Sequence, residues 1–518
     1  MKRIQAVTSP EYQSSSRMSF DDTDRFLVSP VTTISPFRDQ QRPARIAGTP
    51  DSSTSGAEPS SQTRRPQFAC RLRGTAWMAI FTTLVLVEAS AAADPPYRLE
   101  AIAKPGRSQR VKAILEVRGQ LKLNASGQQV RELPLEVKGE LTYDETVLPP
   151  SPRYGTRAVR YYDQASAAIR VDDHLQQSTL DDSARLVVVQ SKGERLTLFS
   201  PLIPLTREQL DLIHLQGNSI LLPRLLPNRE VEIGETWQHA PELITPLLGL
   251  EAVNKATLNS TLSRVERHTA VIELTGTVSG AVNGVSTEID LTGKYNFDLQ
   301  RQRVTWLALG IKENRSIGHA EPGFDVEARL RLVALPIESS PHLTDEALAG
   351  LPLEIDPDAA LLRFRTTTGG FQLLHDRRWQ VMTDRPEVVI FRHVDRGDLI
   401  AQCNVSRMAD APAETEFTLD KFRADIQAAL GDRFGQFIDA SEATNQNGLQ
   451  VLKVIAAGTV ADIPIQWHYY FLSDRKGRSG SFVFTLESSL AERFANADEI
   501  LVETFEFADP PKPATPPQ

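Results

Sequence analysis

The alternation of apolar and polar residues is clearest at residues 271–298, where two alternating runs flank the pair Asn283-Gly284. Alternation with a period of two is typical of strands that bury one face. Asn-Gly readily adopts positive φ angles at both central positions of a type I′ turn, whose twist matches that of paired strands. The pattern therefore predicts a β-hairpin in this stretch.

A similar pattern occurs earlier in the chain. There LEVRGQLK (115–122) resembles IELTGTVS (272–279), and LEVKGELTYD (135–144) resembles IDLTGKYNFD (289–298). All four segments carry a glycine at the fifth position, and glycine weakens a strand unless a bend or a close approach requires it. We therefore hypothesise two related β-sheet halves. The alternative is that alternating strands resemble one another because their two faces must alternate.

Helix and turn signals separate the two halves. Thr206 and Gln209 have the spacing of a capping box and a glycine follows, which predicts a helix at residues 207–216. The segment PNREVEIGETW (227–237) then predicts a turn into a strand that ends at Trp237. This tryptophan either fills the core or offers a stacking surface to a ligand.

The run RVTWLALGI (303–311) predicts a strand that is apolar on both faces. Such a strand is central in its sheet or covered by helices. Alternatively, Trp306 and its neighbours line a cavity for an apolar ligand. A solvated loop is expected to hold the polar residues that follow, namely Glu313, Asn314, Arg315 and His319.

Beyond a proline-rich stretch, strands and helices mix. A hairpin is expected to end at Trp379, shortly after His375, and the strand IPIQWHYYFLSD (463–474) places His468 on its less buried face. A helix follows Thr418, where four apolar residues share one face. A closing helix is expected after a capping box of Ser489 with the glutamate three residues later.

This order of elements resembles the PsbP-like fold, which the photosystem II extrinsic subunit shares with DcrB-type bacterial lipoproteins. The residues that carry the resemblance are FQLLHDRRWQV, IAQCNVS, TLDKFRADIQ, IQWHYYFLSD and GSFVFTLESS, within residues 370–508. The resemblance implies an α/β/α sandwich with an antiparallel sheet, and it implies no catalytic residue, because that fold has no common catalytic motif. The segment 227–237 is similar to a P-x-x-x-V-x-x-G-x-x-W pattern of uncharacterised exported bacterial proteins.

The expected fold class is therefore α+β. A β-rich sandwich, clam or half-barrel is expected at residues 97–335 and a PsbP-like domain at 358–508. Residues 336–357, which contain several prolines, are expected to link them.

The two ends of the chain lack core-forming patterns. Residues 1–74 are rich in Ser, Thr, Pro, Arg and Gln and are expected to be disordered, as is the tail at 509–518. Residues 75–93 follow two arginines and end in small residues, which is the order of a secretory signal peptide. Their apolar run is shorter than the roughly 20 residues of a membrane-spanning helix. We expect cleavage after Ala93 and export, with membrane anchoring by the same segment as the alternative.

Charge and cysteine content narrow the function classes. The net charge is −9, and removal of residues 1–93, which hold 11 basic and 8 acidic residues, makes it −12. Such a surface repels phosphate backbones, so no nucleic-acid partner is expected. Only Cys403 would remain, in a strand-like run where a buried, unreactive thiol is expected.

The sequence contains none of the common catalytic or cofactor motifs: no H-E-x-x-H, no phosphate-binding glycine loop and no G-x-S-x-G. We therefore expect no metal, no cofactor and no identifiable catalytic residue. Groove candidates are the aromatic and histidine residues Trp237, Trp306, His375, Trp379 and His468. The leading hypothesis is a non-enzymatic binding or assembly factor of a cell envelope, whose partner is an envelope protein or an apolar ligand. The alternatives are a hydrolase with its site in an interdomain cleft and a carrier of an apolar ligand in the β-rich domain.

Overall fold

Long antiparallel strands make up most of the part of the chain that the structure describes. In this computed structural model, 57% of the described residues are in strands and 15% in helices. The structure describes residues 95–102, 104–124, 130–368, 370–408 and 417–508. The expected leader, signal segment and C-terminal tail lie outside the described residues. Within the described part, no helix is both long enough and apolar enough to cross a membrane.

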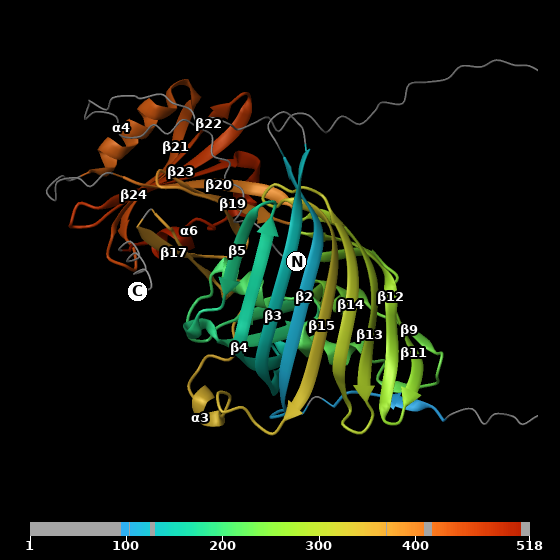
Figure 1. The fold of residues 1–518 in the computed structure, drawn as a ribbon. Helices are drawn as coiled ribbons and strands as arrows, with labels where there is room; N and C mark the ends of the chain where they lie inside the picture. The colour runs from blue at the N-terminus through green and yellow to red at the C-terminus, as the bar shows by residue number, and fades with distance from the viewer. Residues whose placement is uncertain (1–94, 103, 125–129, 369, 409–416, 509–518) are drawn as a thin grey trace, which may run out of the picture. The chain divides into compact units, whose positions relative to one another are not determined.

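The first sheet has 13 strands that run side by side (Figure 1). Across the sheet they follow in the order β7 (Arg195–Phe199), β6 (Leu186–Lys192), β4 (Gly155–Val171), β3 (Val130–Ser151), β2 (Ser108–Asn124), β15 (Gly323–Ile337), β14 (Arg303–Arg315), β13 (Val285–Asp298), β12 (Thr269–Val282), β11 (Asn259–Glu266) and β9 (Thr236–Gln238). Two further strands extend it: β5 (His174–Thr179) pairs with β4, and β10 (Ala252–Ala256) pairs with β12.

The hairpin predicted at residues 271–298 is confirmed as β12 and β13. Its turn residues Asn283 and Gly284 have φ angles of 48° and 67°, as a type I′ turn requires. The similar earlier stretch forms β2 and β3. Strands β2, β3, β4 and β6 cross the sheet in the same direction as β12, β13, β14 and β15, so the segments that resemble each other hold equivalent places. The duplication itself stays a hypothesis.

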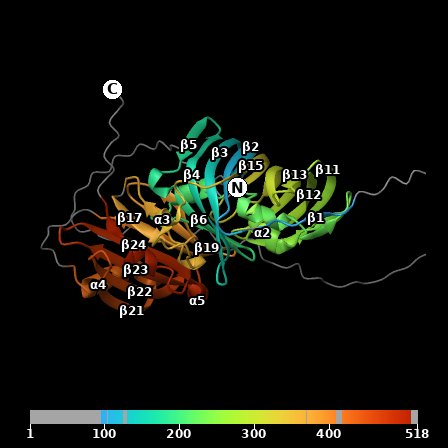
Figure 2. The same cartoon turned by 90° about the horizontal axis from the view of Figure 1, so that it is seen from below.

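One face of this sheet is covered by short segments of the same chain. Figure 2 shows α2 (Pro241–Leu248) and β1 (Tyr97–Leu99) lying against it. Helix α1 (Arg207–Ile213), the 3-10 helix η2 (Ser219–Leu225) and strand β8 (Arg229–Val231) complete the cover, and all contribute to one apolar core. The capping box of α1 is confirmed: the hydroxyl of Thr206 accepts from the backbone of Gln209, and the Gln209 side chain accepts in return. The helix ends at Ile213, three residues earlier than predicted.

The proline-rich stretch is not an extended spacer. It forms α3 (Asp345–Leu348) and the 3-10 helix η3 (Pro357–Ala359). Leu343 within this stretch and Ala360 just after it are buried in a small apolar cluster with residues of β3, β4, β6 and β7. The division of the chain into two domains at this stretch stays a prediction.

The second large sheet has seven strands, in the order β18 (Trp379–Asp384), β19 (Val389–Asp395), β20 (Asp398–Arg407), β24 (Ser479–Glu487), β23 (Ile463–Ser473), β22 (Gln450–Val460) and β21 (Phe434–Thr444). A small sheet combines β16 (Leu362–Arg365), β17 (Phe371–His375) and β25 (Glu506–Phe507). The helical segments of this region are α4 (Leu419–Leu430), η4 (Gly431–Arg433), η5 (Ser488–Leu490), α5 (Ala491–Phe494) and α6 (Glu499–Glu503). In the first region, the 3-10 helix η1 (Asp182–Ala184) lies between β5 and β6. Cys403 lies buried in β20, where burial raises the pKa of its thiol.

The expected α+β class is wrong, because the described chain is mostly β with several antiparallel sheets. The first region is one continuous sheet rather than a sandwich of two. In the second region, only α4 reaches 12 residues. The expected closing helix is broken into η5, α5 and α6, since Ala495 adopts a positive φ of 47° that interrupts helical geometry. The helix predicted after Thr418 is confirmed as α4, which the Thr418 side chain caps. The capping box expected at Ser489 does not form, because α5 begins at Ala491 and has no side-chain cap.

Candidate functional site

The five groove candidates do not come together in one site. Trp237 is buried in β9 and its Nε1 donates to the carbonyl of Leu225 at 2.9 Å. Trp306 is half-buried in β14, on the face opposite the core residues Leu307 and Leu309. Trp237 therefore fills the core, and Trp306 does not contact the buried side of the sheet.

The other three candidates are all buried residues of the C-terminal region. Trp379 is fully buried and donates from Nε1 to the carbonyl of Ala497 at 3.0 Å. The Nδ1 of His375 lies 2.8 Å from the carbonyl of Asp376. His468, expected on the less buried face of its strand, is 7% exposed and lies 2.7 Å from the carboxylate of Asp498. All three side chains are buried, His375 in β17, Trp379 in β18 and His468 in β23. Their place in a groove stays a prediction.

Sequence reasoning did not single out His393, which lies in the same aromatic cluster. Its ring is 4.9 Å from that of Trp379 and is fully buried. Neither ring nitrogen has a hydrogen-bond partner among the described residues. Burial lowers the pKa of His393 to about 4. Asp376, 4.0 Å away, favours the protonated ring, but burial outweighs it.

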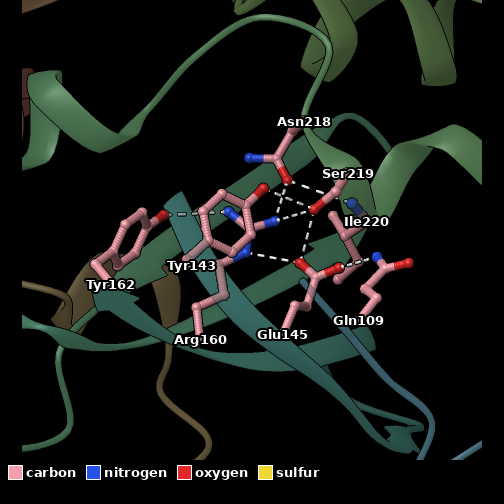
Figure 3. Close-up of polar contacts among 8 residues, drawn as sticks. All are labelled: Gln109, Tyr143, Glu145, Arg160, Tyr162, Asn218, Ser219 and Ile220. Carbon is pink, nitrogen blue, oxygen red and sulfur yellow. Dashed lines mark hydrogen bonds and ion pairs between the residues drawn. The ribbon is translucent and has the colours of Figure 1, made fainter. Parts of the chain in front are cut away.

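A different group of residues forms the most polar part of the first core. We call it the Glu145 cluster, and Figure 3 shows its residues Gln109, Tyr143, Glu145, Arg160, Tyr162, Asn218 and Ser219. Glu145 and Arg160 form an ion pair of 2.7 Å, with side chains 2% and 1% exposed. Glu145 also accepts from Ser219 at 2.8 Å and from Gln109 at 2.7 Å. Arg160 donates to Asn218 at 2.5 Å and to Ser219 at 2.9 Å.

The positions of these residues follow from strand geometry and a helix start. Glu145 and Arg160 are directly paired across β3 and β4, so both side chains point to the same face of the sheet. On that face η2 begins, and the side chain of Asn218 caps it by accepting from the backbone of Ile220. The cluster thus fixes the start of η2 to the sheet.

The electrostatics of the cluster keep its charges fixed. Burial alone lowers the pKa of Arg160, but Tyr143 and Glu145 outweigh burial and raise it, so the guanidinium stays charged. Burial raises the pKa of Tyr143, so its hydroxyl stays neutral. Ser219 does not have an activating base, because Glu145, the carboxylate that it contacts, is already paired with Arg160. The cluster is built to hold charge rather than to transfer protons.

A cavity of about 80 Å³ adjoins this cluster. We call it the Arg303 cavity. It lies where the starts of β2 and β14 meet η2 and a segment that includes Ala101, Ile102 and Arg107. The backbone of Ile102 bonds to Gln302 at 3.1 Å, which holds that segment beside β14. The lining residues are Ala101, Ile102, Arg107, Ser108, Gln109, Glu145, Val147, Thr156, Ala158, Ser219, Ile220, Leu222, Pro223, Gln302, Arg303 and Val304.

The charge of this cavity comes from two arginines and one carboxylate. Arg303 has a buried Nη1 with no hydrogen-bond partner among the described residues. Its pKa is lowered first by burial and then by the charges of Arg107 and Arg301. Glu145 is balanced by Arg160, so the cavity carries excess positive charge. It can accept a small negative group.

A larger hollow of about 440 Å³ is lined by Arg118, Gly119, Gln120, Lys122, Glu132, Asp325, Val326 and Glu327. Its charged residues have both signs, and most of its lining is exposed. Arg118 is paired with Glu136 at 3.2 Å. This hollow is a solvated surface with no convergent polar groups.

The expected solvated loop at residues 313–319 is partly wrong. Glu313 and Arg315 are the last residues of β14 and form a buried ion pair of 2.6 Å. Arg315 also pairs with Glu321 at 3.5 Å and lies over the ring of Phe324. The alternation of β14 continues past its apolar run, which places both charges inside. Elsewhere too, the described residues provide no group of three or more His, Cys, Asp or Glu that could hold a metal ion.

No protein-family model matches the sequence, and no curated protein matches it significantly. Among solved structures, the cyanobacterial PsbP protein of Synechocystis is 18% identical, covers 28% of this chain and 92% of its own, and gives a TM-score of 0.23. A Pseudomonas aeruginosa protein of unknown function, described as a putative regulator, is 14% identical over 28% of this chain and 94% of its own, with a TM-score of 0.21. Lipovitellin is 10% identical over 50% of this chain and 28% of its own, with a TM-score of 0.26.

The matches to PsbP-like structures agree with the resemblance noted from the sequence, over a limited share of the chain. Their TM-scores are too low to support any statement on function. None of these matches supports the resemblance of residues 227–237 to exported bacterial proteins.

No direct signal in the sequence indicated the Arg303 cavity. Its residues come from segments more than 200 positions apart, from Ala101 to Val304. One usable signal was Glu145, a charged residue within an otherwise alternating strand, with Arg160 in the next strand at the facing position. A hairpin register would have paired them, but between Glu145 and the turn the register of β3 and β4 shifts at Leu148 to Ser151, which the sequence does not reveal.

Proposed function

We propose that this chain is a non-enzymatic binding or assembly protein of a cell envelope, to which it is exported. The observation that carries the binding role is the Arg303 cavity, which two arginines line together with aliphatic residues. A few polar groups that converge in a partly apolar recess are typical of binding sites. The net negative charge of the chain makes a nucleic-acid partner unfavourable on electrostatic grounds.

The contact between Ser260 and His239 resembles a catalytic pair, but its surroundings favour a structural role. Ser260 lies 2.7 Å from Nε2 of His239, which is the spacing of a nucleophile and its base. However, Ser260 is fully buried, and it accepts from Tyr295 at 3.0 Å. Burial lowers the pKa of His239 to about 4, so this histidine is a weak base. A substrate has no access to this pair.

The carrier alternative requires an internal space for an apolar molecule. In the described part of the first sheet, α1, η2 and α2 fill the covered face with their own side chains. The Arg303 cavity has room for a small group but not for a whole acyl chain. The geometry therefore favours binding of a polar group at the edge of the core.

Native mass spectrometry of the protein purified from its host's envelope fraction tests the proposal. We expect a copurified ligand or partner, no hydrolysis of envelope substrates, and a mature chain that begins at Asp94. An empty monomer that hydrolyses such substrates, with activity lost in His239→Ala, would overturn the binding role in favour of a hydrolase. A chain that retains residues 75–93 in the membrane would replace export by anchoring.

A further inference from the structure

We propose that the Arg303 cavity binds a small anionic group, a carboxylate or a phosphate, through the guanidinium groups of Arg303 and Arg107. This inference rests on the proposed binding function and names the chemistry of its ligand.

The first observation is a buried donor that lacks an acceptor. Nη1 of Arg303 is buried and has no hydrogen-bond partner among the described residues. A buried polar group without a partner is costly, and a charged one more so. A negative group in the cavity would supply the missing acceptor. Guanidinium groups suit this role because their planar donors match carboxylate and phosphate oxygens.

The second observation is that like charges gather at this point. Arg107 lines the cavity with Arg303, and one of its nitrogens donates to the carbonyl of Ile102 at 2.7 Å. The exposed Arg301 lies two residues before Arg303 in the chain and is paired with Asp298 at 2.8 Å. The repulsion between Arg107 and Arg303 contributes to the lowered pKa of Arg303. An anion between them would replace repulsion by two attractive contacts.

The third observation concerns the carboxylate in the lining of the cavity. Glu145 is the acidic residue among those that line the cavity. Its oxygens are occupied by Arg160, Ser219 and Gln109. It is thus an unavailable counterion for Arg303, and its charge is compensated from within the Glu145 cluster. Because Glu145 is held by the Glu145 cluster, the positive charge of Arg107 and Arg303 is not compensated by a carboxylate in the cavity lining.

Size and lining restrict the ligand further. A buried water needs about 10–15 Å³ of cavity volume measured this way, so about 80 Å³ accommodates a few waters or one small anionic group. Ala158, Leu222 and Val304 supply apolar contacts beside the charges. A carboxylate or phosphate that carries an aliphatic substituent fits this combination. The same chemistry occurs in free anions and in lipid headgroups.

The test is isothermal titration calorimetry on the mature chain with three probes: inorganic phosphate, butyrate, and vesicles that contain phosphatidylglycerol. We expect saturable binding of at least one probe and a loss of affinity of tenfold or more in Arg303→Gln and in Arg107→Gln. Arg303→Lys, which keeps the charge, should retain part of the affinity. The matched control is Arg264→Gln, because Arg264 is exposed on β11 of the same sheet and pairs with Glu266; it should bind like the unchanged protein.

The outcomes separate the sources of the anion. Binding of phosphate or butyrate that depends on Arg303 identifies a free anion, and binding of vesicles alone with the same dependence identifies a lipid headgroup. Binding of none of the probes, or equal weakening in Arg264→Gln and Arg303→Gln, would overturn the anion site. A folded Arg303→Gln protein that still copurifies with its ligand or partner in native mass spectrometry would also overturn it, while the proposed binding function would stand.

Discussion

At the scale of single residues, the Glu145–Arg160 pair illustrates how a buried charge is tolerated. Each member is almost fully buried, and each has at least three polar partners in the Glu145 cluster. Two charges removed from water lose hydration energy that their mutual attraction repays only with good geometry and further hydrogen bonds. The pair therefore depends on every neighbour that completes it.

We predict that Glu145→Gln destabilises the protein by about 3–5 kcal/mol, because it leaves Arg160 as an unpaired buried charge. Urea denaturation at neutral pH measures this change. The matched control is Glu140→Gln on the same strand, since Glu140 pairs with the half-exposed Lys112 at 2.6 Å. Exposed pairs contribute about 0–1 kcal/mol. Similar small losses in both variants would contradict the assigned role of the cluster.

His393 predicts a dependence of stability on pH. Its folded pKa is lowered to about 4 by burial, while the unfolded value is near 6.5. The unfolded state therefore binds more protons between these values, and stability falls as pH drops from about 6.5 towards 4. This single group should cost about 2 kcal/mol between pH 7 and pH 5.

We expect His393→Leu to lose less stability than the unchanged protein when the pH is lowered from 7 to 5. Urea denaturation at both values gives the comparison. His174→Gln serves as the control, because His174 is exposed in β5, and it should leave the pH dependence unchanged. An unaltered pH dependence in His393→Leu would show that His393 is not held neutral by burial.

At the scale of elements, the glycines of the matched strands differ in what surrounds them. A Cβ at Gly276 of β12 would lie 2.4 Å from the carbonyl oxygen of Thr257 and 2.6 Å from the Cα of Leu258. At Gly139 of β3 the nearest atom would be 3.8 Å away. Close approach of the β10–β11 connection therefore explains the first glycine but leaves the second unexplained.

We predict that Gly276→Ala destabilises the protein by about 2 kcal/mol or more, because two backbone atoms would have to move. Gly139→Ala should be neutral or slightly stabilising, since alanine restricts the unfolded chain and meets no obstacle. Thermal denaturation of the two variants measures the difference. Equal effects would mean that the strand can shift freely at Gly276.

At the scale of the whole molecule, the described residues contain one large apolar core of the first sheet and separate cores around the second sheet. We predict that native-state hydrogen exchange resolves two regions. Gly276→Ala should speed exchange in residues 97–337 and leave residues 371–507 unchanged. His393→Leu at pH 5 should slow exchange in residues 371–507 alone. Exchange that changes throughout the chain in both variants would indicate one cooperative unit and would remove the proposed domain boundary.

Local patterns predicted the local features well. The Asn283-Gly284 turn and the capping box at Thr206 each depend on a few neighbouring residues, so sequence spacing was sufficient. The predicted fold class was wrong because assigning it requires the lengths of the helices and strands, which short sequence patterns do not determine. The break at Ala495, and the weight of strands up to 22 residues long, depend on packing that no short window contains.

The sequence by itself determined which residues alternate, where hairpins turn and which segments carry matched glycines, because these features are set by neighbours along the chain. Only the tertiary structure decided that the two similar stretches occupy equivalent places in one sheet. It also decided that His468 and Trp379 are buried, and that Arg107, Arg303 and Glu145 line the same cavity. Burial and the meeting of like charges arise between segments distant in sequence. The free energies of burial and charge repulsion depend on which residues lie close together in space, and the anion-binding proposal follows from that arrangement.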